Sequence, residues 1–203
     1  MTSKSIKNVN FNVYNEKTNK LIEKFEWIWA RTFDIDNVMS LYWNQANPKV
    51  LELGCFNWRE YLYLSEKTNN YLWIDISKDA IEDAKNKYNE NSFIVWDFEE
   101  YIFEWKFNIV LAFASLLHSD MVTTRLIFDK VYDLLEKWWI FYVSLKSSEN
   151  YTQVTKKDEF WKRIYYYYSL DEYKKIWWEK FKVIYEDEQN FNNQKWFTLA
   201  FKK

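Results

Sequence analysis

Glycine is almost missing from this chain. Among 203 residues only Gly54 is a glycine, whereas average usage of about 7% would give roughly 14. Proline and cysteine also occur once each, as Pro48 and Cys55. A single cysteine excludes a disulfide framework and is typical of a reducing compartment, so we expect a cytoplasmic protein. One cysteine and one histidine, His118, do not make a zinc cluster, so we expect no metal site.

Neither sign of charge dominates, and long apolar runs are missing as well. Lysine and arginine number 28 against 30 acidic residues, so the net charge of −2 predicts no steering toward nucleic acid. No uninterrupted apolar run approaches the ~18 residues that cross a bilayer, and residues 1–8 lack the apolar core of a secretory signal. An apolar content of 48% supports a sizeable core in one domain. We therefore expect neither a nucleic-acid nor a membrane partner, and the sequence gives no prediction of the oligomeric state.

The most informative stretch lies around the single glycine. An apolar run at 50–53 contains Glu52 near its end and is followed by a turn at Gly54. A second apolar run, at 71–75, ends in Asp75. This pattern predicts a strand, a tight turn, a helix and a second strand. Such a unit binds a nucleoside-containing cofactor, because a turn that opens a helix presents backbone N–H groups and the second acid can accept both ribose hydroxyls.

Strands and helices alternate along the rest of the chain, which predicts a doubly wound α/β sheet of about seven strands, mostly parallel, with helices on both faces. We expect strands at 50–53, 71–75, 93–95, 107–113, 140–145, 182–186 and 196–201, the last two able to pair as a hairpin. We expect helices at 57–67, 77–89, 122–136 and 170–177. The remaining expectations are a loosely held segment at 1–12, one or two covering helices within 14–46, and a lid or hairpin at 147–168.

The order and spacing of these motifs resemble the class I S-adenosylmethionine-dependent methyltransferases. Glu52-x-Gly54-x-Phe56-x-Trp58 is similar to their first motif, in which an acid precedes glycines at alternate positions. The resemblance covers about residues 48–145, and more loosely the chain to 203. It implies a Rossmann-like fold whose last strand is antiparallel, S-adenosylmethionine as cofactor and, more weakly, a small-molecule methyl acceptor.

The resemblance also implies a division into a helical cap at 1–46 and a methyltransferase domain at 47–203. Within that domain, Glu52 would orient the ammonium group of the cofactor, and Asp75 would accept hydrogen bonds from its ribose hydroxyls. Asp97 would accept from the adenine amino group. The other residues implied to line the cofactor are Gly54, Cys55, Phe56, Trp58, Ile76, Phe98 and Ala112. The alternatives are an ordinary strand-to-helix turn and acids that only flank helices or end strands.

Four further residues are candidates for the acceptor side. His118 ends an Ala-Ser-Leu-Leu-His segment similar to one methyltransferase subgroup, and its pKa near neutrality suits proton transfer. The alternative is a capping or core histidine, since proximity and desolvation can drive methyl transfer without a base. Lys146 and Arg163 can hold an anionic acceptor, with Tyr166 closing over it. Their alternative is a solvated loop with aromatic side chains on the sheet edge.

Many of the 13 tryptophans stand where this family commonly has glycine. Trp58 occupies the third glycine of the first motif, and Trp73, Trp96, Trp138 and Trp139 occupy comparable positions. Turn-like contexts also surround Trp105, Trp161, Trp178 and Trp196, whereas Trp29 and Trp43 lie in helix-like contexts. We propose that most of these tryptophans are translated UGA codons that encode glycine in some bacterial lineages. The alternative is a genuinely tryptophan-rich protein with aromatic platforms for sugars or bases.

Two other functions are alternatives to a methyltransferase. A non-catalytic protein that binds a ligand or partner on a degenerate methyltransferase scaffold would follow if Phe56 and the tryptophans are genuine. A nicotinamide-dependent dehydrogenase fits less well, because its signature lacks the acid two residues before the first glycine. A serine hydrolase is disfavoured, because no serine lies in a Gly-x-Ser-x-Gly elbow.

Overall fold

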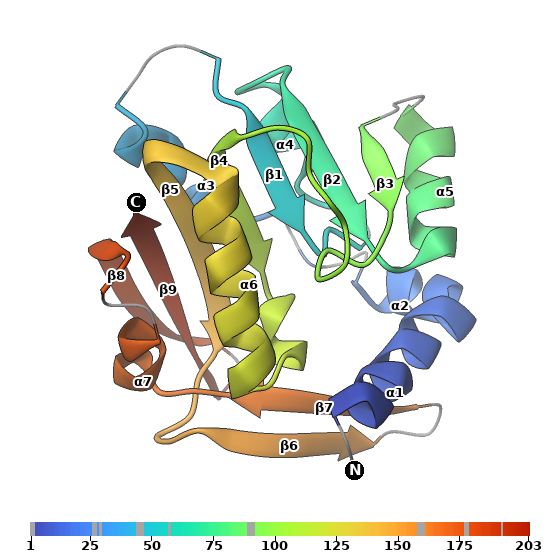
Figure 1. Ribbon diagram of the computed structural model, residues 1–203. Coiled ribbons are helices and arrows are strands. Elements are labelled where there is room, and N and C mark those ends of the chain that lie inside the picture. The colour runs from blue at the N-terminus through green and yellow to red at the C-terminus, as the bar shows by residue number, and fades with distance from the viewer. Residues whose placement is uncertain are drawn as a thin grey trace.

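A seven-stranded sheet forms the centre of the molecule (Figure 1). The computed structural model describes residues 3–25, 28, 30–43, 47–56, 58–88, 92–157, 161–176, 179–191 and 193–203. The sheet consists of β1 (Val50–Leu53), β2 (Tyr71–Asp75), β3 (Phe93–Val95), β4 (Phe107–Phe113), β5 (Leu135–Lys146), β8 (Lys182–Phe191) and β9 (Gln194–Lys202), in the order β3-β2-β1-β4-β5-β9-β8. Strands β1 to β5 are parallel, and β9 runs antiparallel between β5 and β8. This topology confirms the predicted fold class, including the antiparallel last strand.

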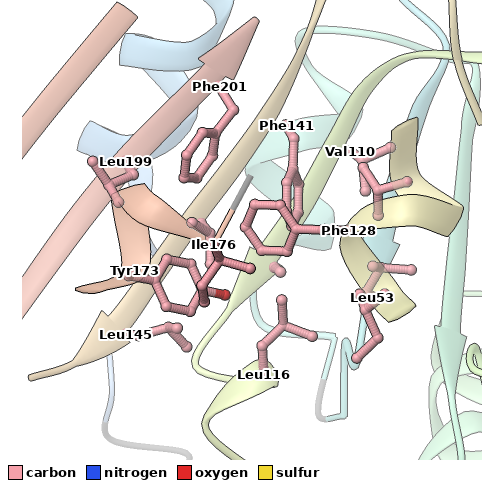
Figure 2. Close-up of a cluster of buried hydrophobic side chains, with 14 of the residues drawn as sticks. Leu53, Val110, Leu116, Phe128, Phe141, Leu145, Tyr173, Ile176, Leu199 and Phe201 are labelled. Atoms are coloured by element: carbon pink, nitrogen blue, oxygen red, sulfur yellow. The ribbon is translucent and has the colours of Figure 1, made fainter. Parts of the chain in front are cut away.

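Helices cover both faces of the sheet. They are α1 (Ser3–Glu16), α2 (Thr18–Phe25), α3 (Thr32–Leu41), α4 (Tyr61–Ser65), α5 (Lys78–Tyr88), α6 (Met121–Leu134) and α7 (Leu170–Lys175), with a short 3-10 helix η1 (Leu116–His118). One face packs under α6 and α7, and Figure 2 shows Phe128 of α6 against Phe141 and Phe201 of the sheet. The other face packs under α3, α4 and α5. Within the part of the chain that is described, no helix has the length and apolar character needed to cross a bilayer.

The carboxyl ends of the parallel strands point to the lower edge of the sheet in Figure 1, where α1, α2 and a hairpin lie. The hairpin consists of β6 (Thr152–Lys157) and β7 (Lys162–Tyr167), which pair antiparallel and confirm the hairpin predicted at 147–168. Helix α1 contacts β7, α2 and α5. Helices α1 and α2 and the β6–β7 hairpin therefore cover the edge of the sheet at which the sequence predicts the functional acids.

The N-terminal segment differs from the sequence-based expectation. Residues 3–12 belong to α1 rather than to a loosely held tail, because the Asn10 side chain donates to the Ile164 carbonyl and accepts from the Ile164 amide, both at 2.9 Å. Helices α2 and α3 lie within 14–46, which confirms the one or two helices predicted there. Helix α4 is shorter than the predicted 57–67, although residue 57 lies outside the described residues. Trp29 and Trp178, and the predicted helix ends at 89 and 177, also lie outside them.

Several bulky residues have a backbone conformation that L-amino acids rarely adopt. The φ angles of Phe56, Trp58 and Trp138 are 36°, 48° and 76°. A left-handed conformation costs a residue with a Cβ atom roughly 1–2 kcal/mol, and glycine avoids this cost. Of the five tryptophans placed on family glycine positions, Trp58 and Trp138 therefore have backbone that favours glycine. The other three, Trp73, Trp96 and Trp139, have negative φ.

Replacing Trp138 by glycine tests this backbone strain. Trp138 is exposed, and its ring contacts Lys137 and Lys202. Trp105 is a matched control, because it is also exposed with a lysine, Lys49, over its ring, but its φ is negative. We expect the free energy of unfolding of Trp138→Gly to exceed that of Trp105→Gly by about 1–2 kcal/mol in urea denaturation. Equal losses in both variants would contradict the strain.

Candidate active site

A cavity of about 940 Å³ lies at the carboxyl edge of the sheet. Its lining comes from the ends of β1, β2, β4, β5 and β9, from the hairpin strand β7 and from α1, α2 and α3. Ligand sites measure roughly 300–1,000 Å³, so this volume can hold more than one small ligand. Most of the predicted site residues line it: Glu52, Gly54, Cys55, Phe56, Asp75, Ile76, Asp97, Phe98, His118, Lys146 and Arg163.

The turn after β1 has no room for a side chain at residue 54. The φ of Gly54 is 73°, and a Cβ atom there would lie 2.4 Å from the Cβ of Ser115. The Gly54 amide donates to the Ile74 carbonyl at 2.8 Å, which ties the turn to β2. Two residues later, the Phe56 ring is buried against Tyr14 and Phe25. Backbone therefore lines the cavity at Gly54, and an aromatic ring lines it at Phe56.

Asp75 is held at the end of β2 by backbone amides. The Phe56 amide donates to Oδ2 at 2.9 Å and the Ser77 amide to Oδ1 at 2.8 Å. Burial raises the pKa of Asp75 to about 6, and these hydrogen bonds oppose the rise. Each carboxylate oxygen keeps a second lone pair, so Asp75 can still accept from a ligand.

Glu52 faces the same cavity as Asp75 and lacks a complete set of partners. It is 2% exposed, and its Oε2 atom has no hydrogen-bond partner among the described residues. Burial raises the pKa of Glu52 well above its usual value, and the nearby Glu60 adds to this effect. Arg59 and Arg31 act in the opposite direction, although Arg59 pairs with Glu60 at 2.8 Å and Arg31 with Asp34 at 3.1 Å. A cation from a ligand would satisfy this carboxylate.

Asp97 and Phe98 follow β3, the strand at the edge of the sheet beside β2, and both line the cavity. Asp97 Oδ1 accepts from the Glu99 amide at 3.0 Å, which fixes the local turn. The Phe98 and Glu99 carbonyls accept from Lys130 Nζ, so the segment is anchored to α6. Three acids at the ends of three adjacent strands therefore reach one cavity.

His118 also lines the cavity, in a partly buried hydrogen-bond network. Its Nδ1 lies 2.9 Å from the Ile164 carbonyl oxygen, which can only accept, so this geometry assigns the proton to Nδ1. Nε2 then accepts from the Tyr14 hydroxyl at 2.9 Å. Burial lowers the pKa of His118 to about 4; the Ile164 hydrogen bond opposes this, while Arg163 and Lys146 reinforce it. The imidazole is therefore neutral near pH 7.

Three predicted site residues do not line the cavity. The Trp58 ring packs on Tyr88 and under Lys87, so it does not fill the site. Ala112 is fully buried within β4, and Phe113 and Ala114 line the cavity after it. Tyr166 faces away, because side chains alternate along β7 and Arg163 and Tyr165 take the cavity side. The Tyr166 ring stacks instead on Tyr151 at 6.2 Å.

Several residues that line the cavity are not predicted from the sequence, among them Asn10, Tyr14, Arg31 and Tyr165. Asn10 and Tyr14 are four residues apart, which places them on one face of a helix, and this spacing was an available signal. Nothing in the sequence around Arg31 marks it. No cluster of metal-ligating side chains occurs among the described residues.

Residues 44–189 match a protein-family model described as a methyltransferase domain. The chain belongs to this methyltransferase family. No curated protein sequence matches it significantly. Solved structures share this fold at low sequence identity, among them three that cover 91% or more of this chain.

The first is 1,6-didemethyltoxoflavin-N1-methyltransferase from Burkholderia thailandensis, with bound 1,6-didemethyltoxoflavin and S-adenosylhomocysteine; it has a TM-score of 0.81, 13% identity and coverage of 100% of this chain and 91% of that one. Magnesium protoporphyrin IX methyltransferase from Synechocystis, with bound S-adenosylmethionine, has a TM-score of 0.74, 14% identity and coverage of 100% and 98%. An S-adenosylmethionine-dependent methyltransferase from Clostridium acetobutylicum has a TM-score of 0.73, 14% identity and coverage of 91% and 98%.

Adding a methyl group at residue 54 should disrupt this methyltransferase domain. Gly54→Ala combines the cost of positive φ with the collision against Ser115, so we expect a loss of about 2–4 kcal/mol in the free energy of unfolding. Ser115→Gly in the same chain removes the collision but not the φ cost, so the double variant should recover part of the loss. A Gly54→Ala loss below about 0.5 kcal/mol in urea denaturation would show that the turn has room.

Proposed function

We propose that this chain binds S-adenosylmethionine and transfers its methyl group to a small-molecule acceptor. The observation that carries the proposal is that Glu52 and Asp75 line one cavity on either side of the Gly54 turn. Carboxyls that faced different cavities would have contradicted it. Membership of the methyltransferase family and neighbours crystallised with S-adenosylmethionine or S-adenosylhomocysteine support it further.

The residues at the ends of β1 and β2 fit this cofactor. Glu52, buried with an unpartnered oxygen, would hold its ammonium group. Asp75, fixed by two backbone amides, would accept from its ribose hydroxyls. Gly54 lines the cavity with bare backbone, and a Cβ atom there would collide with Ser115. Asp97, Ile76 and Phe98 would contact the adenine.

When bound, the cofactor supplies an electrophilic methyl group on a sulfonium, and the acceptor must lose a proton as it gains the methyl group. The Tyr14 hydroxyl lines the cavity and donates to Nε2 of a neutral His118. Tyr14 can therefore accept a hydrogen bond from the nucleophile of the acceptor while its own proton stays in the bond to His118. The proton that the acceptor loses passes to solvent, because an imidazole with a pKa of about 4 is too weak a base to hold it near pH 7.

We also propose a division of the chain. Residues 1–46 would act as a helical cap, whose described residues Asn10, Tyr14 and Arg31 line the cavity, and residues 47–203 would be the methyltransferase domain. Cys55 is buried and unpaired, as a reducing cytoplasmic environment would leave it. The small-molecule acceptor is inferred from the volume of the cavity and from neighbours named for a toxoflavin precursor and a porphyrin.

The recoding of UGA codons as glycine is part of the proposal. Positive φ at Trp58 and Trp138 supports glycine at those two positions. Sequencing the gene tests it, because UGG codons at positions 58, 73, 96, 138 and 139 would end it. Phe56 also has positive φ, and recoding does not explain this residue.

Calorimetry with S-adenosylmethionine tests the function. We expect binding by the chain with glycine at positions 58, 73, 96, 138 and 139, and a loss of about tenfold or more in its Glu52→Gln variant, because the ammonium loses a charged partner. Glu82→Gln, on the exposed side of α5, is the matched control and should bind normally.

The outcomes distinguish the alternatives. Binding only by the glycine version supports recoding. Failure of both the glycine version and the chain as written favours a non-catalytic scaffold. Release of S-adenosylhomocysteine across an acceptor panel would then identify the acceptor.

The affinity for S-adenosylmethionine should depend on pH. The raised pKa values of Asp75, about 6, and of Glu52 mean that both acids lose their charge in the empty cavity as the pH falls. The ligand needs the ionised forms, so affinity should fall below pH 6, approaching about tenfold per pH unit for each acid. Asp75→Asn should weaken binding at pH 8 and reduce this slope. An affinity that stays constant between pH 8 and pH 5 would contradict the assignment of these acids.

A further inference from the structure

Among the described residues, Arg163 is a buried cation without a counter-charge. It is 9% exposed, and its Nε atom has no hydrogen-bond partner among those residues. Its guanidinium lies over the rings of Trp161, Tyr165 and Phe25 at 5.6, 5.6 and 6.0 Å. No carboxylate of the described residues forms an ion pair with it. Burying an unpaired charge costs free energy, and an anionic ligand beside Arg163 would offset this cost.

Lys146 provides a second cation at the same place. It extends from β5 over the rings of Trp196 and Tyr165, at 5.5 and 5.8 Å, so Tyr165 contacts both cations. Burial lowers the pKa of Lys146 to about 8, and the charges that add to this effect are Lys156 and Arg163, both positive. Within the described part of the chain it forms no ion pair either.

These cations lie on the acceptor side of the cavity. The Tyr165 ring lies under both cations, and its centroid is 4.9 Å from that of His118. His118 in turn accepts from the Tyr14 hydroxyl at 2.9 Å. Both cations also contribute to the lowered pKa of His118. They are therefore close to Tyr14 and His118, on the side of the cavity formed by β5 and β7 rather than by the ends of β1 and β2.

We propose that the methyl acceptor is a small anion whose carboxylate or phosphate group binds between Lys146 and Arg163, with its body against the surrounding aromatic rings. This inference rests on the proposed function, because it assigns an occupant to the second half of the same cavity. Arg163 offers the planar, forked donor set that suits either anion, and Lys146 adds a point charge. Binding there leaves the nucleophile of the acceptor close to Tyr14.

The test uses matched pairs of small aromatic ligands with the S-adenosylhomocysteine complex. The pairs are benzoate against benzamide and phenyl phosphate against phenol, with inorganic phosphate as the smallest probe. We expect at least one anion to bind with a Kd of about 1 mM or tighter in calorimetry while its neutral partner binds at least about tenfold more weakly. Preference for benzoate would indicate a carboxylate acceptor, and preference for phenyl phosphate a phosphorylated one.

Variants locate the site. Arg163→Met and Lys146→Met should each weaken anion binding by about tenfold or more, whereas Arg163→Lys should retain part of it. Lys162→Met, on the exposed side of β7 next to Arg163, is the matched control and should change binding by less than about twofold. Lys146 lies on a different strand, so Lys146→Met still tests whether the anion binds here if Arg163→Met fails to fold.

Three outcomes would overturn the inference. These are no anion binding at the stated affinity, equal binding of neutral partners, and anion binding that survives both methionine substitutions. Affinity for S-adenosylhomocysteine, measured on each variant, separates this inference from the proposed function. If both variants lose the cofactor product instead of the anion, the cations belong to the cofactor. If neither the chain as written nor its glycine version binds S-adenosylhomocysteine, the proposed function fails, and anion binding is still scored on the free chain.

Discussion

The close approach of the β1 turn to the segment after β4 controls the geometry of the whole cavity. With only hydrogen at residue 54, the backbone can lie against Ser115 while its amide bonds to the Ile74 carbonyl of β2. Three strand ends are thereby fixed relative to one another. Glu52 and Asp75 consequently reach the same space rather than opposite sides of the turn. One missing methyl group thus determines where two buried carboxyls point.

The sequence predicts the part of the site that depends on neighbouring strands. Glu52, Asp75 and Asp97 follow apolar runs, and the carboxyl ends of parallel strands share one edge, so their convergence follows from the strand pattern. The sequence does not predict contacts that depend on how distant elements dock. Tyr14 reaches His118 across more than one hundred residues because Asn10 fastens α1 to β7. Nor does it give the register of β7, which turns Tyr165 inward and Tyr166 away.

A tryptophan at a family glycine position does not always have a backbone conformation that requires glycine. The family pattern marks Trp58, Trp73 and Trp138 alike, but only backbone angles show where a side chain is strained. Trp58 and Trp138 have such strain, whereas Trp73 is fully buried in β2 and stacks on Phe93. Glycine at residue 73 would leave a void under α4 and α5 unless neighbouring side chains moved, because lost packing is costly in a dense core. The recoded chain would therefore pack differently on that face of the sheet.

Charge is distributed unevenly around the cavity, and this has a consequence for its ligands. Acids gather at the ends of β1, β2 and β3, while Lys146 and Arg163 lie near His118 without acidic partners in the part of the chain that the structure describes. A bound cation would neutralise the acids but leave Lys146 and Arg163 repelling each other. A cationic sulfonium on the acidic side and an anion on the basic side would satisfy both at once. Because opposite charges also attract each other across a cavity of low dielectric, each ligand would favour the binding of the other.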